Sequence, residues 1–307
     1  PSTPITTPFE SLPSVAAANA SSNANVISVS NPDQRSSYYP KDSGSIGNSM
    51  SAVCAVGFTE DANPRFRPTM EDGHVILDKF RGRAEEAFFA VYDGHGGRKA
   101  VDIVNGKLHG IFAEELEQWD PPRAFYEAYR RVDDLLAENK CQYVGTTSVT
   151  CYICKDAQGR TVLYTANAGD ARAVLCRNGN AVRLSYDHKA SDVSELKRVS
   201  DSGGFVAAKR VNGVLSVSRA LGDHAMKNVV ICAPHVTKEF IDVENMHLII
   251  ACDGLWDVMS DEDAVKFVWE KWSTRGADTQ QISKKLVKAA LEKGSTDNIS
   301  VMCVKLS

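Results

Sequence analysis

The chain has 307 residues, of which 43% are hydrophobic and 24% charged, and its formal net charge is -4. A chain of this length and composition buries a full hydrophobic core, so neither disulfides nor a structural metal is needed for stability. The slightly acidic balance without basic clusters disfavours nucleic-acid binding, and no apolar run approaches the roughly 20 residues that span a bilayer. We therefore expect no nucleic-acid partner and no membrane span.

The N-terminal part differs in composition from the rest. Residues 1–50 contain six of the eleven prolines and twelve serines, but only five charged residues, and they show no sustained periodicity. Such a segment buries too little apolar surface to offset the entropy lost on ordering. We predict a flexible low-complexity extension over 1–50 and one folded domain over 51–307.

From Ser51 the pattern changes to regular secondary structure. Short runs rich in β-branched and aromatic residues predict strands at 52–58, 73–80, 86–92, 145–154, 161–167, 171–177, 180–184, 247–252 and 298–306. Apolar residues at helical spacing predict helices near 98–117, 122–138, 261–273 and 278–293. The stretch 187–235 is polar and punctuated by glycine, and no element is predicted there.

The order of these elements predicts the fold class. The helices come in two consecutive pairs rather than one after each strand, which argues against a parallel doubly wound sheet. Tight turn signals, such as Asn178-Gly179, join neighbouring strands in antiparallel fashion. We predict an α+β domain of antiparallel sheets covered by helix pairs.

The eight cysteines indicate a reducing compartment. Most of them lie inside apolar, strand-like runs: Cys54, Cys151, Cys154, Cys176, Cys252 and Cys303. Reduced thiols in such runs behave as small core residues. We therefore expect an intracellular protein, cytoplasmic or nuclear.

Carboxylates recur where the predicted strands begin or end. The pairs are Glu71-Asp72, Asp93-Gly94, Asp253-Gly254 and Asp297-Asn298. A turn explains one such pair, but four of them beside apolar strands indicate a cluster. Oxygen ligands suit Mg²⁺ or Mn²⁺, whereas Zn²⁺ prefers His and Cys, and no His or Cys pair here has zinc spacing. Without a metal, converging carboxylates repel one another, and some should bind protons unusually tightly.

The carboxylates belong to a longer series of motifs. In chain order these are Arg67-Pro-Thr-Met-Glu71-Asp72, Tyr92-Asp93-Gly94-His95-Gly96-Gly97, Gly145-Thr146-Thr147, Ala168-Gly169-Asp170-Ala-Arg172, Asp187-His188-Lys189, Arg210-Val-Asn-Gly213-Val-Leu-Ser-Val-Ser-Arg219-Ala-Leu-Gly222-Asp223, Ala251-Cys-Asp253-Gly254-Leu-Trp256-Asp257 and Thr296-Asp297-Asn298. Together they resemble the metal-dependent (type 2C, PPM) serine/threonine protein phosphatases. The resemblance covers about residues 52–306, and eight motifs in family order make a chance match negligible.

The resemblance implies a set of metal ligands. By position in the motifs, Asp93 would bridge two metal ions, and Asp253 and Asp297 would complete the first site. Glu71 and the carbonyl of Gly94 would hold the second ion. Two Mg²⁺ or Mn²⁺ ions are therefore expected, together with a looser third one.

The resemblance also implies roles for the residues around the metals. Arg67 would bind the phosphate, and His95 would act as general acid for the leaving alkoxide. Asp72 would orient metal-bound water, and Asp170 would help to hold the third ion. Asp257 is left open between that third site and a structural role at a helix entry.

The implied fold is a layered α-β-β-α sandwich of two antiparallel sheets flanked by helix pairs. The implied reaction is hydrolysis of phosphoserine and phosphothreonine in proteins, by a water activated between the two metals. The region about 190–230 corresponds to a flap beside the cleft, which we expect to shape substrate choice. Phosphoprotein substrates and a monomer are expected.

The sequence also offers three alternatives to a metal-dependent phosphatase. Cys154 and Arg160 have the spacing of cysteine phosphatases, but a hairpin turn there leads into a strand rather than into a phosphate-binding loop and helix. Cys151 and Cys154 fail as a redox pair, because positions i and i+3 of a strand face opposite ways. A catalytically weak binding scaffold with the phosphatase fold would be visible as loss of metal carboxylates, yet all of them are retained.

Overall fold

The computed structural model describes residues 3–4, 50–242, 246–272 and 278–306. These ranges fall in one compact unit, residues 1–5 and 46–307. The predicted extension over 1–50 lies almost entirely outside the described residues, apart from the two-residue strand β1 (Thr3–Pro4) and Met50. No helix in the described ranges is long and apolar enough to cross a bilayer.

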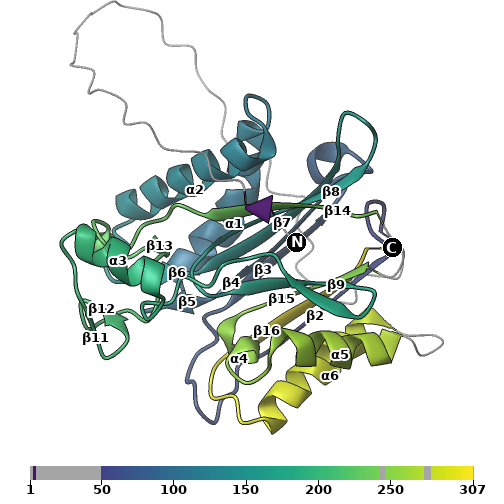
Figure 1. The fold of residues 1–307 in the computed structure, drawn as a ribbon. Coiled ribbons are helices and arrows are strands. Elements are labelled where there is room, and N and C mark those ends of the chain that lie inside the picture. The colour runs from purple at the N-terminus through teal and green to yellow at the C-terminus, as the bar shows by residue number, and fades with distance from the viewer. Residues whose placement is uncertain (1–2, 5–49, 243–245, 273–277, 307) are drawn as a thin grey trace, which may run out of the picture. The chain divides into compact units, whose positions relative to one another are not determined.

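Two antiparallel sheets form the centre of this unit (Figure 1). The first, in the order β1-β14-β8-β7-β4-β3, comprises β1, β3 (Gly73–Asp78), β4 (Ala87–Tyr92), β7 (Ser148–Lys155), β8 (Thr161–Ala168) and β14 (His235–Phe240). The second, in the order β10-β9-β15-β16-β2, comprises β2 (Ala55–Asp61), β9 (Arg172–Arg177), β10 (Asn180–Arg183), β15 (Met246–Ala251) and β16 (Ile299–Lys305). Every neighbouring pair is antiparallel.

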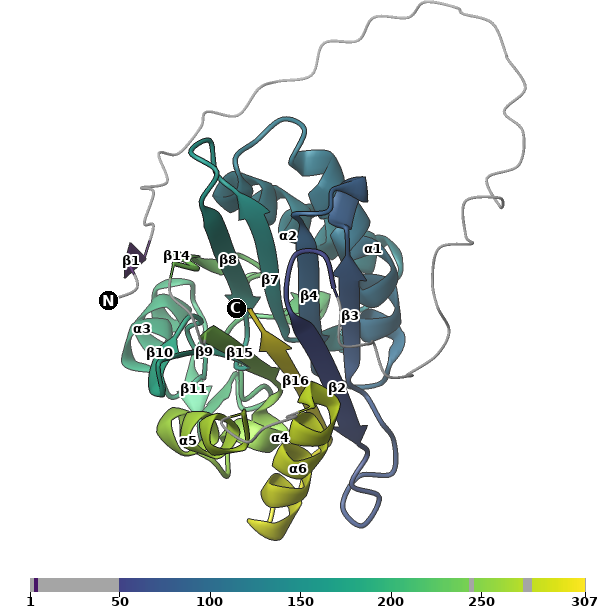
Figure 2. The same ribbon diagram turned by 90° about the vertical axis from the view of Figure 1, so that its right-hand side faces the viewer.

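Helix pairs cover the outer faces of the two sheets (Figures 1 and 2). The first sheet carries α1 (Lys99–Glu115) and α2 (Pro121–Glu138), and the second carries α5 (Asp261–Trp272) and α6 (Thr279–Glu292). On β4, Phe88 packs with Phe112 of α1, whereas its neighbour Phe89 lies in the core between the sheets with Leu175. Such alternation is expected of a strand buried on both faces. The predicted α+β class and α-β-β-α layering are confirmed.

A helix, a strand and the bounds of one further strand differ from the sequence prediction. The helix α3 (Val193–Asp201) lies where no element is predicted, because it buries only Glu195 and Val199 and so has a weak apolar signal. The strand β14 escapes prediction because only two of its six residues, Val236 and Phe240, are apolar, so its apolar signal is weak. The strand β2 is shifted from 52–58 to Ala55–Asp61, since its pairing with β16 continues beyond the apolar run.

Short elements complete the fold. A hairpin is formed by β11 (Val206–Ala207) and β12 (Arg210–Val211), and a three-stranded sheet by β13 (Leu221–Gly222), β6 (Gly145–Thr146) and β5 (Gly94–His95). The remaining short helices are α4 (Asp253–Trp256), η2 (Phe80–Gly82) and η3 (His224–Met226). The strand β6 lies in the middle of its sheet, so it brings β5 and β13 to either side of itself.

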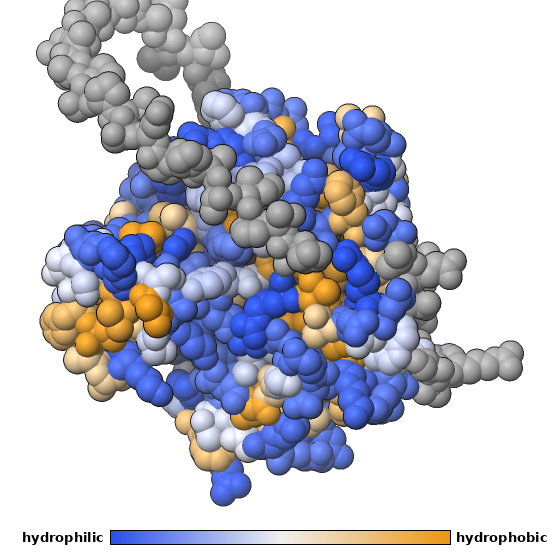
Figure 3. Space-filling view, viewed as in Figure 1, coloured by the Kyte–Doolittle hydropathy of each residue, from blue (hydrophilic) through white to orange (hydrophobic). Residues whose placement is uncertain are grey.

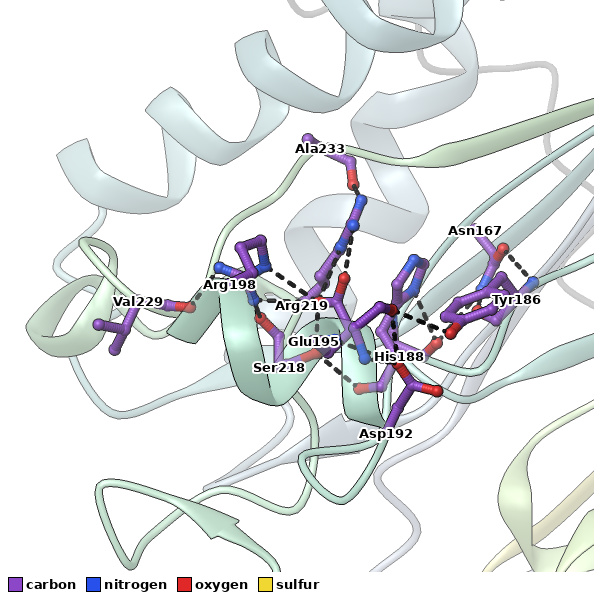
Figure 4. A network of polar contacts seen from close by, with 12 residues as sticks. Asn167, Tyr186, His188, Asp192, Glu195, Arg198, Ser218, Arg219, Val229 and Ala233 are labelled. Atoms are coloured by element: carbon purple, nitrogen blue, oxygen red, sulfur yellow. Dashed lines mark hydrogen bonds and ion pairs between the residues drawn. The ribbon is translucent and has the colours of Figure 1, made fainter. Parts of the chain in front are cut away.

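The flap, defined here as residues 190–230, is held at its base by Glu195 (Figure 4). The Glu195 carboxylate accepts hydrogen bonds from Arg219 Nη2 at 2.6 Å, Ser218 Oγ at 2.6 Å and Arg198 Nη2 at 3.0 Å. Burial alone would raise the pKa of Glu195, but the hydrogen bonds and charges of the two arginines prevail and lower it to about 2. A buried ion network therefore ties α3 to the segment that precedes β13.

Candidate active site

A cavity of about 200 Å³ opens where strands of the two sheets end. Its lining includes seven residues that the sequence analysis singled out, namely Arg67, Asp93, Gly94, His95, Asp170, Asp253 and Asp297. Asp93 follows β4 of the first sheet, and Asp253 follows β15 of the second. Stacking the two sheets therefore brings together carboxylates that are far apart in the sequence.

The carboxylates of the cavity repel one another. Desolvation and the charge of Asp253 hold the pKa of Asp93 well above its ordinary value. Desolvation and the charge of Asp297 raise the pKa of Asp253 to about 6. Desolvation and the charge of Asp253 raise the pKa of Asp170 to about 8. A cluster that binds protons so readily offers strong electrostatic attraction to any cation that replaces them.

Asp72 lies behind this cluster rather than in the cavity lining. Its side chain is buried, and ligand atoms of Asp72, Asp93 and Cys252 lie within 4.8 Å of one another. The Oδ2 atom of Asp72 has no hydrogen-bond partner within the described ranges. Burial, the first cause, together with the charges of Asp253 and Asp297, raises the pKa of Asp72 to about 7. A buried carboxylate oxygen without a partner fits a site built around a cation and its waters.

Glu71 is fixed in the turn that precedes β3. Its backbone N–H donates to Oδ1 of Asn298 at 2.9 Å, and its carboxylate accepts from Thr69 Oγ1 at 3.1 Å and from the Gly97 N–H at 3.2 Å. A Cβ at Gly94 would lie 2.5 Å from the Glu71 carbonyl oxygen. Only glycine lets these two backbones approach, so the Gly94 carbonyl and the Glu71 carboxylate belong to segments in direct contact.

Arg67 contributes a positive charge to the cavity. Its guanidinium forms an ion pair with the carboxylate of Asp297, and its Nε donates to the carbonyl of Thr296 at 3.4 Å. The Arg67 side chain is 50% exposed. A half-exposed guanidinium can turn from the carboxylate to another anion that enters the cavity.

The sequence analysis assigns no role to several further residues of the site, among them Thr147, Arg210 and Asp223. The N–H of Thr147 donates to the Asp93 carbonyl at 2.8 Å, and Arg210 of β12 lines the cavity. Buried Asp223 places its Oδ2 at 2.7 Å from Nε2 of His95. All three stand inside the recognised motifs, but their partners lie in other motifs, so a local pattern does not reveal the contacts.

Asp257 does not line the cavity. It ends α4 instead of entering a helix, so the helix-entry alternative is wrong. Its carboxylate accepts from Lys189 Nζ at 2.7 Å, and the same ammonium lies 3.8 Å from Asp170. Lys189 therefore supplies one of the few positive charges near the carboxylates.

The sequence is similar to known proteins over most of its length. Residues 56–299 match the protein phosphatase 2C family. The chain belongs to this family. Protein phosphatase 2C homolog 1 of Schizosaccharomyces pombe is 42% identical over 274 residues, which cover 85% of this chain and 77% of the relative. The protein of the same name from Saccharomyces cerevisiae is 39% identical over 269 residues, which cover 82% of this chain and 93% of the relative.

A solved structure shares the fold. The crystal structure of a phosphatase from a pathogenic strain of Toxoplasma gondii has a TM-score of 0.72 and 22% identity, and the match covers 84% of this chain and 94% of that chain. Membership of the protein phosphatase 2C family confirms the predicted enzyme class, a serine/threonine protein phosphatase, and the predicted dependence on metal.

The two thiols of the cysteine-based alternatives, Cys151 and Cys154, are not placed for catalysis. Cys154 lies on β7, where burial raises its pKa to about 11, so its thiolate is scarce at neutral pH. Cys151, on the same strand, lies in the core between the sheets, whereas Cys154 lies in the core under the helices. The two sulfurs face opposite sides of the sheet, as predicted, and no nucleophilic or redox pair is formed.

Proposed function

We propose that this protein hydrolyses phosphoserine and phosphothreonine in proteins with the help of two Mg²⁺ or Mn²⁺ ions. The supporting observation is the cavity in which Asp93, Asp253 and Asp170 all have raised pKa values. Carboxylates that repel one another in a cavity gain from divalent cations, and an all-oxygen ligand set suits Mg²⁺ or Mn²⁺.

The proposed ligands follow the sequence motifs. Asp93 would bridge the two ions, Asp253 and Asp297 would complete the first site, and Glu71 with the Gly94 carbonyl would hold the second. Asp170 would join a looser third ion. When bound, the ions would acidify an attacking water and neutralise charge on the phosphoryl oxygens.

Three side chains would handle the substrate. Arg67 would leave Asp297 and bind the phosphoryl oxygens with its guanidinium, a geometry suited to paired hydrogen bonds. His95, in the cavity lining, would donate a proton to the departing seryl or threonyl oxygen. Asp72, buried behind Asp93, would orient water through its free oxygen.

The surroundings of the cavity suggest how substrates are chosen. The flap contributes Arg210, Leu215, Ser216 and Val217 to the lining. Phosphoprotein side chains entering the cavity would therefore meet the flap first, and its residues would set the preferred sequence around the phosphate. The domain over 51–307, a monomeric state and a cytoplasmic or nuclear location stay predictions.

Metal removal tests the reaction class. Chelation should abolish hydrolysis of a phosphoserine peptide, and added Mn²⁺ or Mg²⁺ should restore it, while alkylation of thiols should leave it largely intact. Chelator-resistant turnover that is sensitive to alkylation would contradict the proposal. Binding of phosphopeptide without turnover at saturating metal would support the scaffold alternative instead.

The substitution His95→Gln tests the general acid. A seryl alkoxide is a poor leaving group, whereas nitrophenolate is a good one, so loss of the acid should slow phosphoserine peptide hydrolysis by about 10²-fold or more. Hydrolysis of nitrophenyl phosphate should change much less. Metal affinity has to be measured in the same variant, because His95 adjoins Gly94. Equal losses on both substrates at saturating metal would remove the general-acid role.

A further inference from the structure

The small sheet β13-β6-β5 brings together three segments that are distant in the sequence. His95 on β5 pairs with Gly145 on β6, and Gly145 pairs on its other side with Gly222 on β13. Asp223 follows Gly222 directly. His95 and Asp223 are therefore separated by the width of one strand, and that strand carries Gly145 between them.

The side chains of His95 and Asp223 meet over Gly145. Nε2 of His95 lies 2.7 Å from Oδ2 of Asp223, and Asp223 is only 1% exposed. A Cβ at position 145 would lie 2.1 Å from Asp223 Oδ2 and 2.6 Å from His95 Nε2. The contact therefore requires glycine at position 145.

Apart from its contact with His95, the Asp223 carboxylate forms no hydrogen bond in the described ranges. Its second carboxylate oxygen, Oδ1, is buried without a hydrogen-bond partner in the part of the chain that the structure describes. Its backbone has φ 53°, a left-handed conformation that is unfavourable for most residues with a side chain. A buried carboxylate with one partner contributes little to the stability of a fold. Its presence is explained by what it does to the histidine.

We propose that Asp223 is a positioning residue for His95, an inference that rests on the general-acid role proposed above. A carboxylate only accepts hydrogen bonds, so Asp223 selects the form of the ring in which Nε2 carries a hydrogen and donates it. No residue in the described ranges forms a hydrogen bond with Nδ1 of His95, and His95 lines the cavity. Nδ1 is then the nitrogen that serves the substrate.

The proton transfer follows from this arrangement. As the bond between phosphorus and the attacking water oxygen forms, the ester P–O bond breaks and its electron pair stays on the seryl or threonyl oxygen. The proton on Nδ1 of the imidazolium moves to that oxygen, which leaves a neutral ring still donating Nε2–H to Asp223. One proton of the water stays in the phosphate product, and the other returns through solvent to the ring. Asp223 holds the ring in this orientation through the hydrogen bond to Nε2 and takes up no proton.

Substrate-dependent kinetics of Asp223→Asn test the proposal. Asn keeps the size of Asp and tolerates positive φ, so the variant should fold. At saturating Mn²⁺ we expect its kcat to fall about 10- to 100-fold on a phosphoserine peptide and less than about threefold on nitrophenyl phosphate. The double variant with His95→Gln should be no slower than His95→Gln alone. Equal losses on both substrates, or losses that multiply in the double variant, would overturn the proposal.

Asp133→Asn is the matched control. Asp133 of α2 accepts from the Gly222 N–H at 2.8 Å and from Lys227 Nζ at 3.0 Å, so it supports the same segment without a hydrogen bond to His95. This variant should lower stability but keep the ratio of the two kcat values. If it changes that ratio as Asp223→Asn does, positioning belongs to the segment as a whole and the assignment to Asp223 is wrong.

Nitrogen NMR of the His95 ring separates this inference from the proposed function. The wild-type ring should carry its hydrogen on Nε2 in the neutral form, and Asp223→Asn should give a mixture of tautomers. An unchanged tautomer overturns the positioning role even where His95→Gln behaves as loss of a general acid. A changed tautomer supports positioning, even where His95→Gln slows both substrates equally and the general-acid role fails.

Discussion

Two groups of buried carboxylates in this phosphatase have opposite electrostatic surroundings. At the base of the flap, Glu195 is surrounded by Arg198, Arg219 and the Ser218 hydroxyl, and its pKa is lowered to about 2. In the cavity, Asp253 and Asp170 face further carboxylates, and their pKa values are raised to about 6 and about 8. Figure 4 shows Arg198, Arg219 and Ser218 arranged around the carboxylate of Glu195.

The difference shows how to separate a structural carboxylate from a functional one. Glu195 has its counter-charges on the same chain, so its burial is compensated whenever the protein is folded. The cavity carboxylates have too few counter-charges on the chain, because those of Arg67 and Lys189 are shared among several acids. The fold tolerates this repulsion, which indicates that the missing positive charge comes from outside.

The largest effect on activity is expected from Asp253→Asn. The variant would weaken a proposed ligand of the first metal while keeping the side-chain volume, so kcat should fall by about 10³-fold or more. Because one repelling charge is gone, the metal-free variant should be at least as stable to urea as the metal-free wild type at pH 8. The exposed Asp263→Asn, with the same charge change, is the control. Near-normal turnover at saturating Mn²⁺ would reassign Asp253.

Glu195→Gln should lower stability and leave the metal site unchanged, which is the opposite of the effect expected from Asp253→Asn. It leaves Arg198 and Arg219 without their buried counter-charge, so the free energy of unfolding should fall by on the order of 3 kcal/mol. Metal affinity, measured by calorimetry, should stay unchanged, since Glu195 is not in the cavity lining. Asp201→Asn is the control on the same helix: it breaks only an exposed ion pair with Lys197, worth less than about 0.5 kcal/mol. A stability loss equal to that of the control would mean that the network is not structural.

The metal-free protein should become less stable as pH rises, because the pKa values of the cavity carboxylates are raised. Folded Asp253 and Asp170 hold protons up to about pH 6 and about pH 8, whereas the ordinary value is 3.8. Between about pH 4 and pH 8 the folded state binds more protons than the unfolded state, so stability falls as pH rises, by several kcal/mol. Urea unfolding with chelator measures this slope, and saturating Mg²⁺ should reduce it.

The Glu195 network provides the internal comparison for that experiment. The pKa of Glu195 is lowered from 4.5 to about 2, so its stabilisation is complete above about pH 4.5 and is lost only as pH falls towards 2. The stability difference between wild type and Glu195→Gln should therefore be constant from pH 5 to pH 8. A difference that shrinks across that range would contradict the assignment of the low pKa.

The smallest effect is expected from removal of the N-terminal extension. A chain that starts at Ser45 should fold and hydrolyse nitrophenyl phosphate with kcat changed by less than about twofold. Residues 1–44 contain only five charged residues and no sustained apolar pattern, so they supply little to the core or to the cavity. A chain that starts at Gly57 is the control, since it cuts into β2, which pairs with β16 from Ala55 to Asp61. Loss of folding in the Ser45 chain would make the extension part of the domain.

Much of the fold could be predicted from the sequence because its strands and helices have strong, local apolar patterns. The failures have physical causes. The helix α3 is stabilised by the buried ions of Glu195 rather than by an apolar stripe, although Asp192, which accepts from the Ser194 and Glu195 amides, marks its start. The contact of Asp223 with His95 depends on pairing across β6, and no local pattern encodes a register between segments 128 positions apart.

The span of the site along the chain has a consequence for synthesis. Arg67 and Asp297, which pair in the cavity, are separated by 230 positions, and β16 is the strand that joins β2 to β15 in the second sheet. A nascent chain whose residues 297–305 are still inside the ribosome lacks both a proposed metal ligand and the strand that closes the sheet around it. Until these residues have emerged, the site lacks one of its proposed ligands, so activity should begin only after β16 has joined the second sheet.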